Sequence, residues 1–72
     1  MPLAMADLGR EDIIVRVGGR EETRKFLENL GFVTGAAVTV VASMGGNVIV
    51  NIKESRIAIS REMAMKIFLM RG

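Results

Sequence analysis

Residues 20–41 read REETRKFLENLGFVTGAAVTVV, and this is the most informative stretch of the chain. A helix is predicted over Arg20–Leu30, because apolar side chains recur there at the i, i+3, i+4 and i+7 spacing of a surface helix. Glu21 and Glu22 lie in its first turn, where the helix dipole favours negative charge. The residues of the predicted apolar stripe are Thr23, Phe26, Leu27 and Leu30.

Two glycines punctuate the segment that follows the predicted helix. Gly31 comes directly after the last residue of the stripe, where a left-handed residue commonly ends a helix. Phe32 would then fold back onto Leu27, an apolar contact that often accompanies this cap. Gly35 allows the tight turn into a strand that begins at Ala37. The segment therefore predicts a helix, a turn and a strand, and it contains no catalytic group.

Alternating apolar and polar side chains predict short strands on both sides of this unit. The alternation is clearest in the two runs that flank Gly45-Gly46, each with valines on one face. A Gly18-Gly19 pair separates the first predicted strand from the helix. The predicted strands are Ile13–Val17, Ala37–Ser43, Val48–Lys53 and Ile57–Ile59.

The connection between the two central strands decides their register. A two-residue turn at Gly45-Gly46 would put apolar residues of one strand opposite polar residues of the next. A three-residue loop, Gly45-Gly46-Asn47, would instead pair Met44 with Val48 and align the two apolar faces. Because a slip of one residue reverses the face of every side chain, we predict the three-residue loop.

The C-terminal stretch predicts a second helix over Arg61–Met70, with Ser60 as its N-cap. Apolar side chains surround this helix, and a chain of 72 residues can hardly bury all of them. Because methionines recur on adaptable binding surfaces, we predict that the face with Met65, Phe68 and Leu69 binds a partner protein or a second copy of the chain. The alternative is that Phe68 and Leu69 close an open end of the fold.

Together these elements predict a mainly β protein, a small SH3-like five-stranded barrel with one inserted α-helix and a short C-terminal helix. Glycines at corners allow short strands to bend and close such a barrel. An α+β sandwich is the alternative. The length of 72 residues predicts a single domain over residues 1–72.

The composition excludes several kinds of chemistry. Cysteine and histidine are absent, so no disulfide, thiolate nucleophile or imidazole base can form. Ten basic and eight acidic residues are mixed along the chain, without the clustered basic footprint of a nucleic-acid binder. The local carboxylate group of Asp7, Glu11 and Asp12 does not have the spacing of a calcium loop. We therefore predict no enzyme activity, no cofactor, no metal site and no nucleic-acid partner.

The hydropathy pattern predicts a soluble, cytoplasmic protein. Residues 1–8 lack the charged and then apolar order of a signal peptide. No apolar run approaches the roughly 20 residues that a membrane helix needs. We therefore expect no direct membrane insertion.

The order of these motifs resembles the FeoA family, the small cytoplasmic partner proteins of bacterial ferrous iron transport. The same SH3-like module forms the C-terminal domain of iron- and manganese-dependent repressors. The most specific part of the resemblance is the L-x-x-L-G-[FL]-x-x-G segment. The residues that carry it are Leu8-Gly9, Ile13–Val17, Gly18-Gly19, Leu27, Leu30-Gly31-Phe32, Gly35 and Ile57-Ala58-Ile59-Ser60.

The resemblance implies a non-catalytic accessory protein that binds the cytoplasmic part of the FeoB membrane GTPase and modulates it. It also associates the chain with iron ion transport and transition metal ion binding, although the residues themselves offer no metal site. The alternative is a stand-alone regulatory or scaffold domain of the metal-repressor type that binds another protein. Two copies could also associate through the C-terminal helix as a homo-oligomer. The predicted partner-binding residues, with Leu27 and Leu30 acting indirectly from buried positions, are Leu27, Leu30, Gly31, Phe32, Met65, Phe68 and Leu69.

Overall fold

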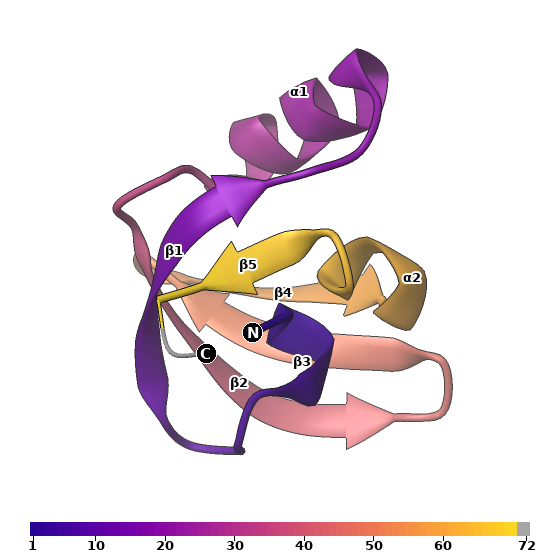
Figure 1. The fold of residues 1–72 in the computed structure, drawn as a ribbon. Helices are drawn as coiled ribbons and strands as arrows, with labels where there is room; N and C mark the ends of the chain where they lie inside the picture. Colours follow the sequence, from indigo (N-terminus) through magenta and orange to yellow (C-terminus); the bar gives the residue numbers. More distant parts are fainter. Residues whose placement is uncertain (71–72) are drawn as a thin grey trace.

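The computed structural model describes residues 1–70, which fold around one strongly curved antiparallel sheet. The elements are η1 (Leu3–Met5), β1 (Glu11–Val17), α1 (Glu21–Leu30), β2 (Ala37–Met44), β3 (Asn47–Ile52), β4 (Ser55–Ser60), α2 (Arg61–Ala64) and β5 (Ile67–Leu69). The strand order is β4-β3-β2-β1-β5, and the sheet curls into a small barrel with α1 at its edge (Figure 1). The predicted five-stranded barrel with an inserted helix is therefore confirmed. No helix within residues 1–70 is long and apolar enough to cross a bilayer.

The core lies inside the barrel and is built from aliphatic side chains and one phenylalanine. The strands β2 and β3 bury alternate residues, so their remaining side chains face outwards. The helix α1 and the turn after it add two residues that close one side of this core. The buried hydrophobic residues are Leu3, Ile14, Leu27, Phe32, Val38, Val40, Val48, Val50, Ile52, Ile59, Ala64, Ile67 and Leu69.

The helix α1 ends as the sequence predicts. Gly31 has a φ of 110°, in the left-handed region, and its N–H donates a hydrogen bond to the carbonyl oxygen of Glu28. The N–H of Phe32 donates to the carbonyl oxygen of Leu27 at 2.9 Å, which completes a Schellman motif. Leu27 and Phe32 are both fully buried in the same core cluster. The glycine cap and the return of Phe32 to the core are therefore confirmed.

Replacing Gly31 with alanine should lower the free energy of unfolding by about 1–2 kcal/mol, because a Cβ atom is strained in the left-handed region. Space is not the limit, since the nearest atoms to an added Cβ belong to Ile52 at 3.9 Å. The control is Gly46→Ala, at a glycine with no positive φ and no atom within 4 Å of an added Cβ. It should change stability by less than about 0.5 kcal/mol. Equal losses in urea denaturation would contradict the cap assignment.

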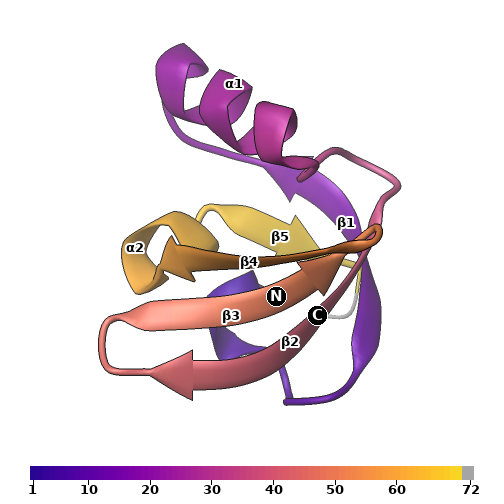
Figure 2. The same ribbon diagram turned by 180° about the vertical axis from the view of Figure 1, so that it is seen from behind.

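Phe26 is more exposed to solvent than its place in the predicted apolar stripe implies. Its side chain is 48% exposed, whereas Leu27 is fully buried and Thr23 and Leu30 are half-buried. The helix α1 stands out from the barrel rather than lying flat on the sheet (Figure 2). It therefore buries only a narrow part of its stripe and leaves the flank with Phe26 in solvent.

The turn between β2 and β3 differs from the predicted one. Gly45-Gly46 forms a two-residue turn, and Met44 pairs with Asn47 rather than with Val48. The predicted three-residue loop is therefore wrong. The shorter turn would mismatch the apolar faces only if pairing continued without interruption along both strands, and it does not.

A β-bulge removes the mismatch that the shorter turn would otherwise create. The register shifts between the Val40–Val50 pair and the Ala42–Ile49 pair, so Val41 has no register partner. One extra residue in a strand restores the alternation on its far side. Val40 and Val50 therefore lie opposite each other and are both buried.

The predicted C-terminal helix is wrong beyond its first turn. Ser60 caps it as predicted, because its hydroxyl oxygen accepts a hydrogen bond from the N–H of Met63 at 3.1 Å. The helix α2 then ends at Ala64, and Ile67–Leu69 forms the strand β5.

Pairing with β1 explains why this segment is a strand. Arg16 lies opposite Phe68, and Val17 lies opposite Ile67. Ile67 and Leu69 are buried and Phe68 points outwards, which is the period of two that a strand requires. A continued helix would leave the backbone groups on this side of β1 without these partners. A short apolar run does not by itself distinguish a buried strand from a helix, so the sequence pattern was ambiguous here.

Candidate partner-binding surfaces

The predicted partner residues on and after α1 lie mostly inside the protein. Leu27, Gly31 and Phe32 are buried, and Leu30 is half-buried against the core. Their place in the core means that they hold α1 against the barrel. Any effect of these residues on a partner would therefore pass through the position of α1.

The exposed aromatic residue of α1 is Phe26, which the predicted set omitted. Its ring is 48% exposed on a helix that stands out from the barrel (Figure 2). Aromatic side chains are enriched in protein interfaces, so the outer side of α1 is a candidate docking surface. The helical period places Phe26 in the apolar stripe, but only the packed structure shows that it faces solvent.

The predicted C-terminal residues divide between the surface and the core. Met65, which follows α2, is 43% exposed, whereas Leu69 in β5 is only 2% exposed. Phe68 is half-buried, and the guanidinium carbon of Arg16 lies 4.4 Å from its ring centroid. This cation–π contact covers part of the ring. Met65 therefore offers the largest accessible apolar surface of the three predicted residues.

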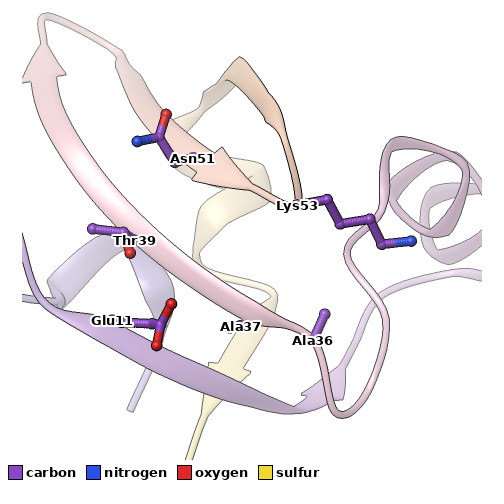
Figure 3. Close-up of a pocket in the computed structure, with 6 residues that line it drawn as sticks. All are labelled: Glu11, Ala36, Ala37, Thr39, Asn51 and Lys53. Atoms are coloured by element: carbon purple, nitrogen blue, oxygen red, sulfur yellow. The ribbon is translucent and has the colours of Figure 1, made fainter.

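Sequence reasoning missed a polar hollow on the outer face of the sheet. The hollow has a volume of about 480 Å³ and lies over β1, β2 and β3 (Figure 3). Its lining residues are Glu11, Ala36, Ala37, Thr39, Asn51 and Lys53. Strand alternation could have shown that Thr39 and Asn51 point outwards, but their meeting with Glu11 depends on register and on the curl of the sheet.

Charged side chains form two ion pairs within residues 1–70. Arg10 lies 3.7 Å from Asp7, and Lys25 lies 3.4 Å from Glu21. Both pairs are solvent-exposed, so each contributes little to stability. No group of three or more acidic side chains in this region is arranged to hold a metal ion.

The fold defines the class of the protein. Five antiparallel strands curl into a barrel, a helix is inserted between the first two strands, and an SH3 domain protein shares this fold. The model of the FeoA domain matches residues 1–71, and the chain belongs to this family. A protein of Methanocaldococcus jannaschii, provisionally named Fe(2+) transport protein A, is 35% identical over 68 residues. That match covers 94% of this chain and 83% of the relative.

Solved structures of related proteins share the fold. A crystal structure of FeoA, described as an iron uptake regulatory protein, is 26% identical with a TM-score of 0.89, covering 96% of this chain and 93% of that one. FeoA from Stenotrophomonas maltophilia in complex with zinc, described as an SH3 domain protein, is 24% identical with a TM-score of 0.84. The match covers 96% of this chain and 88% of that one. A manganese-dependent transcriptional repressor is 15% identical with a TM-score of 0.87. The match covers 96% of this chain and 40% of the repressor. The last two comparisons show the fold alone. The predicted resemblance to the FeoA family, and to the SH3-like domain of metal-dependent repressors, is confirmed.

Proposed function

We propose that this accessory protein of ferrous iron transport binds the cytoplasmic part of a FeoB-type membrane GTPase and modulates it without catalysis of its own. The observation that carries the proposal is the FeoA domain match over residues 1–71, together with a 35% identical relative named for Fe(2+) transport. The absence of cysteine and histidine supports a role by contact, because neither a thiolate nucleophile nor an imidazole base is available. On this proposal the chain acts in the cytoplasm.

The proposed docking surfaces are the exposed apolar side chains near the predicted residues. On α1 the contact would be made by Phe26, while Leu27 and Leu30 hold the helix against the core of the barrel. At the C-terminal side it would be made by Met65 and the accessible part of Phe68. A second copy of the chain is the alternative occupant of the Met65 surface.

Modulation requires the chain to distinguish two states of its partner. A protein shifts a conformational equilibrium only as far as its affinities for the two states differ. Calorimetric titration of the full chain into the soluble GTPase domain of a FeoB-type transporter should therefore give different affinities with GDP and with a non-hydrolysable GTP analogue. No binding in either state, and none to the full-length transporter, would overturn the proposed function.

The variant Phe26→Ser should weaken binding to the GTPase domain by about tenfold or more, because large aromatic side chains commonly dominate interface energies. Its own stability should change by less than about 1 kcal/mol, since the ring is already half in solvent. Met65→Ser is measured in parallel, and sedimentation of both variants reports self-association. Met44→Ser, at a residue 63% exposed on the β2–β3 hairpin, is the control. Unchanged affinity for the first two variants would remove both proposed surfaces.

A further inference from the structure

A single row of polar side chains crosses the outer face of the sheet. Thr39 on β2 lies between two register partners, Glu11 on β1 and Asn51 on β3. Asn51 is in turn the register partner of Arg56 on β4. Residues directly opposite one another in an antiparallel sheet share a face. This polar row therefore runs across four strands, with a carboxylate at one end and a guanidinium at the other.

Two adjoining hollows follow the polar row. The first, of about 480 Å³, extends from Glu11 to Lys53, and the small side chains of Ala36 and Ala37 also line it. The second, of about 350 Å³, lies at the β3–β4 turn. Both hollows are lined by Asn51 and Lys53, so they adjoin on the outer face of the sheet, and together they are called the polar groove. Side chains that line only the second hollow are Glu54, Ser55 and Arg56.

The cationic end of the polar groove is set in place by the protein itself. The Nε of Arg56 donates a hydrogen bond to Oδ1 of Asn51 at 3.1 Å, which orients the guanidinium group. Lys53 has a φ of 57° and is the one non-glycine residue among residues 1–70 in the left-handed region. Lys53 is the first residue of the two-residue turn that joins β3 to β4, a position where hairpin turns take a positive φ, so the turn fixes where its side chain begins.

The charges of the polar groove do not neutralise one another. The side chain of Lys53 extends away from Glu11 (Figure 3). Neither of these residues, nor Arg56, belongs to an ion pair within residues 1–70. The groove therefore presents separated charges of opposite sign to an external ligand.

We infer that the polar groove binds an extended segment of a partner protein that carries an acidic and a basic side chain four residues apart. Lys53 and Arg56 pair with the acidic side chain, and Glu11 pairs with the basic one. The polar row covers three strand spacings, about 14 Å, and four residues of extended chain cover about 13 Å. An even separation also places both ligand side chains on the same face of the segment.

The charge distribution favours a protein segment over other ligands. Glu54 lies beside Lys53 and Arg56, and Glu11 lies at the far end, so the groove is not the uniformly basic surface that phosphate backbones require. A small anion would use only the cationic end and leave Glu11 unpaired. The inference concerns a surface and does not require the partner to be a transporter, so it can fail while the proposed function holds.

Two-dimensional NMR of the isotope-labelled full chain tests this inference with a synthetic peptide, acetyl-Ser-Glu-Thr-Val-Thr-Lys-Ser-amide. Saturable shifts are expected at both ends of the groove, at Glu11 and at Arg56, with a dissociation constant of about 1 mM. The control peptide has the same composition with Glu and Lys adjacent, because a simple exchange of the two could bind in the reverse direction. Equal shifts with the control peptide, equal shifts with inorganic phosphate, or no saturable shifts at up to about 10 mM peptide would overturn the inference.

Three variants separate binding from folding. Arg56→Glu should weaken peptide binding about threefold to tenfold, whereas Arg61→Glu, at an exposed arginine that does not line the groove, should leave it unchanged. Lys53→Gly should also weaken binding, yet its melting temperature should stay the same or rise because glycine tolerates a positive φ. Unchanged binding in Lys53→Gly and Arg56→Glu would show that the cationic end does not contact the ligand.

Discussion

Replacing Leu27 with alanine should lower the free energy of unfolding by about 2–5 kcal/mol. Leu27 is 0% exposed, and its carbonyl oxygen accepts the hydrogen bond that closes the Schellman motif after α1. The substitution leaves a cavity where the helix meets the core. A domain of this length has a total stability of about 4–11 kcal/mol, so this loss could leave a large part of the population unfolded at physiological temperature.

The neighbouring residue is the matched control for Leu27. Phe26→Ala removes a larger side chain, but that ring is 48% exposed, so stability should fall by less than about 1 kcal/mol. The chain has no tryptophan or tyrosine, so far-ultraviolet circular dichroism during urea denaturation is the suitable measurement. Similar losses for the two variants would mean that α1 does not face the barrel through Leu27.

The variant Leu69→Ala should also cost about 2–5 kcal/mol of unfolding free energy. Leu69 is 2% exposed in the strand β5, where it alternates with the outward-facing Phe68. If the segment were the helix predicted from sequence, Leu69 would share an exposed face with Met65 and Phe68. The measured loss therefore tests the strand directly.

The control for Leu69 is the residue that follows it. Met70 is 67% exposed, so Met70→Ala should change stability by less than about 0.5 kcal/mol. Backbone hydrogen exchange gives a second measurement, because the N–H of Met70 donates to the carbonyl oxygen of Ile13 at 2.8 Å. A stable Leu69→Ala variant with fast exchange at Met70 would contradict the pairing of β5 with β1.

The two stability predictions also bear on the interpretation of binding experiments. Leu27 and Leu69 belong to the predicted partner-binding set, yet both are buried. Substitutions at these positions should reduce binding by unfolding the chain or moving α1. Phe26 and Met65 are the informative positions, because their side chains reach solvent while their loss should leave the core intact.

The helix α1, its C-terminal end and the N-cap of α2 could be predicted from short sequence motifs. The spacing of apolar residues predicted α1, and Gly31 after Leu30 predicted its left-handed end. Ser60 before a charged first turn predicted the cap of α2. Each of these features depends on residues within about one turn of the chain, so it can be recognised without knowledge of the fold.

Non-local pairing decided the features that the sequence pattern left open. The bulge at Val41 lets Val40 and Val50 both face the core although the two strands are joined by a two-residue turn. The strand β5 forms because β1 offers it backbone partners that lie some fifty residues earlier in the chain. Both depend on contacts between distant segments, which hydrophobic periodicity does not record.

The candidate surfaces also combine features that local sequence patterns predict with features that only contacts between distant segments fix. Alternation in the sequence is enough to place Thr39 and Asn51 on an outward face, and the helical period is enough to put Phe26 and Leu27 in one stripe. Only the tertiary structure aligns Glu11 with Thr39, or leaves Phe26 in solvent while Leu27 is buried. Where short-range contacts dominate, the order of residues along the chain was thus enough to set which segments become helix or strand. The packed barrel decided register, closure and exposure, because these depend on which distant surfaces exclude water from one another.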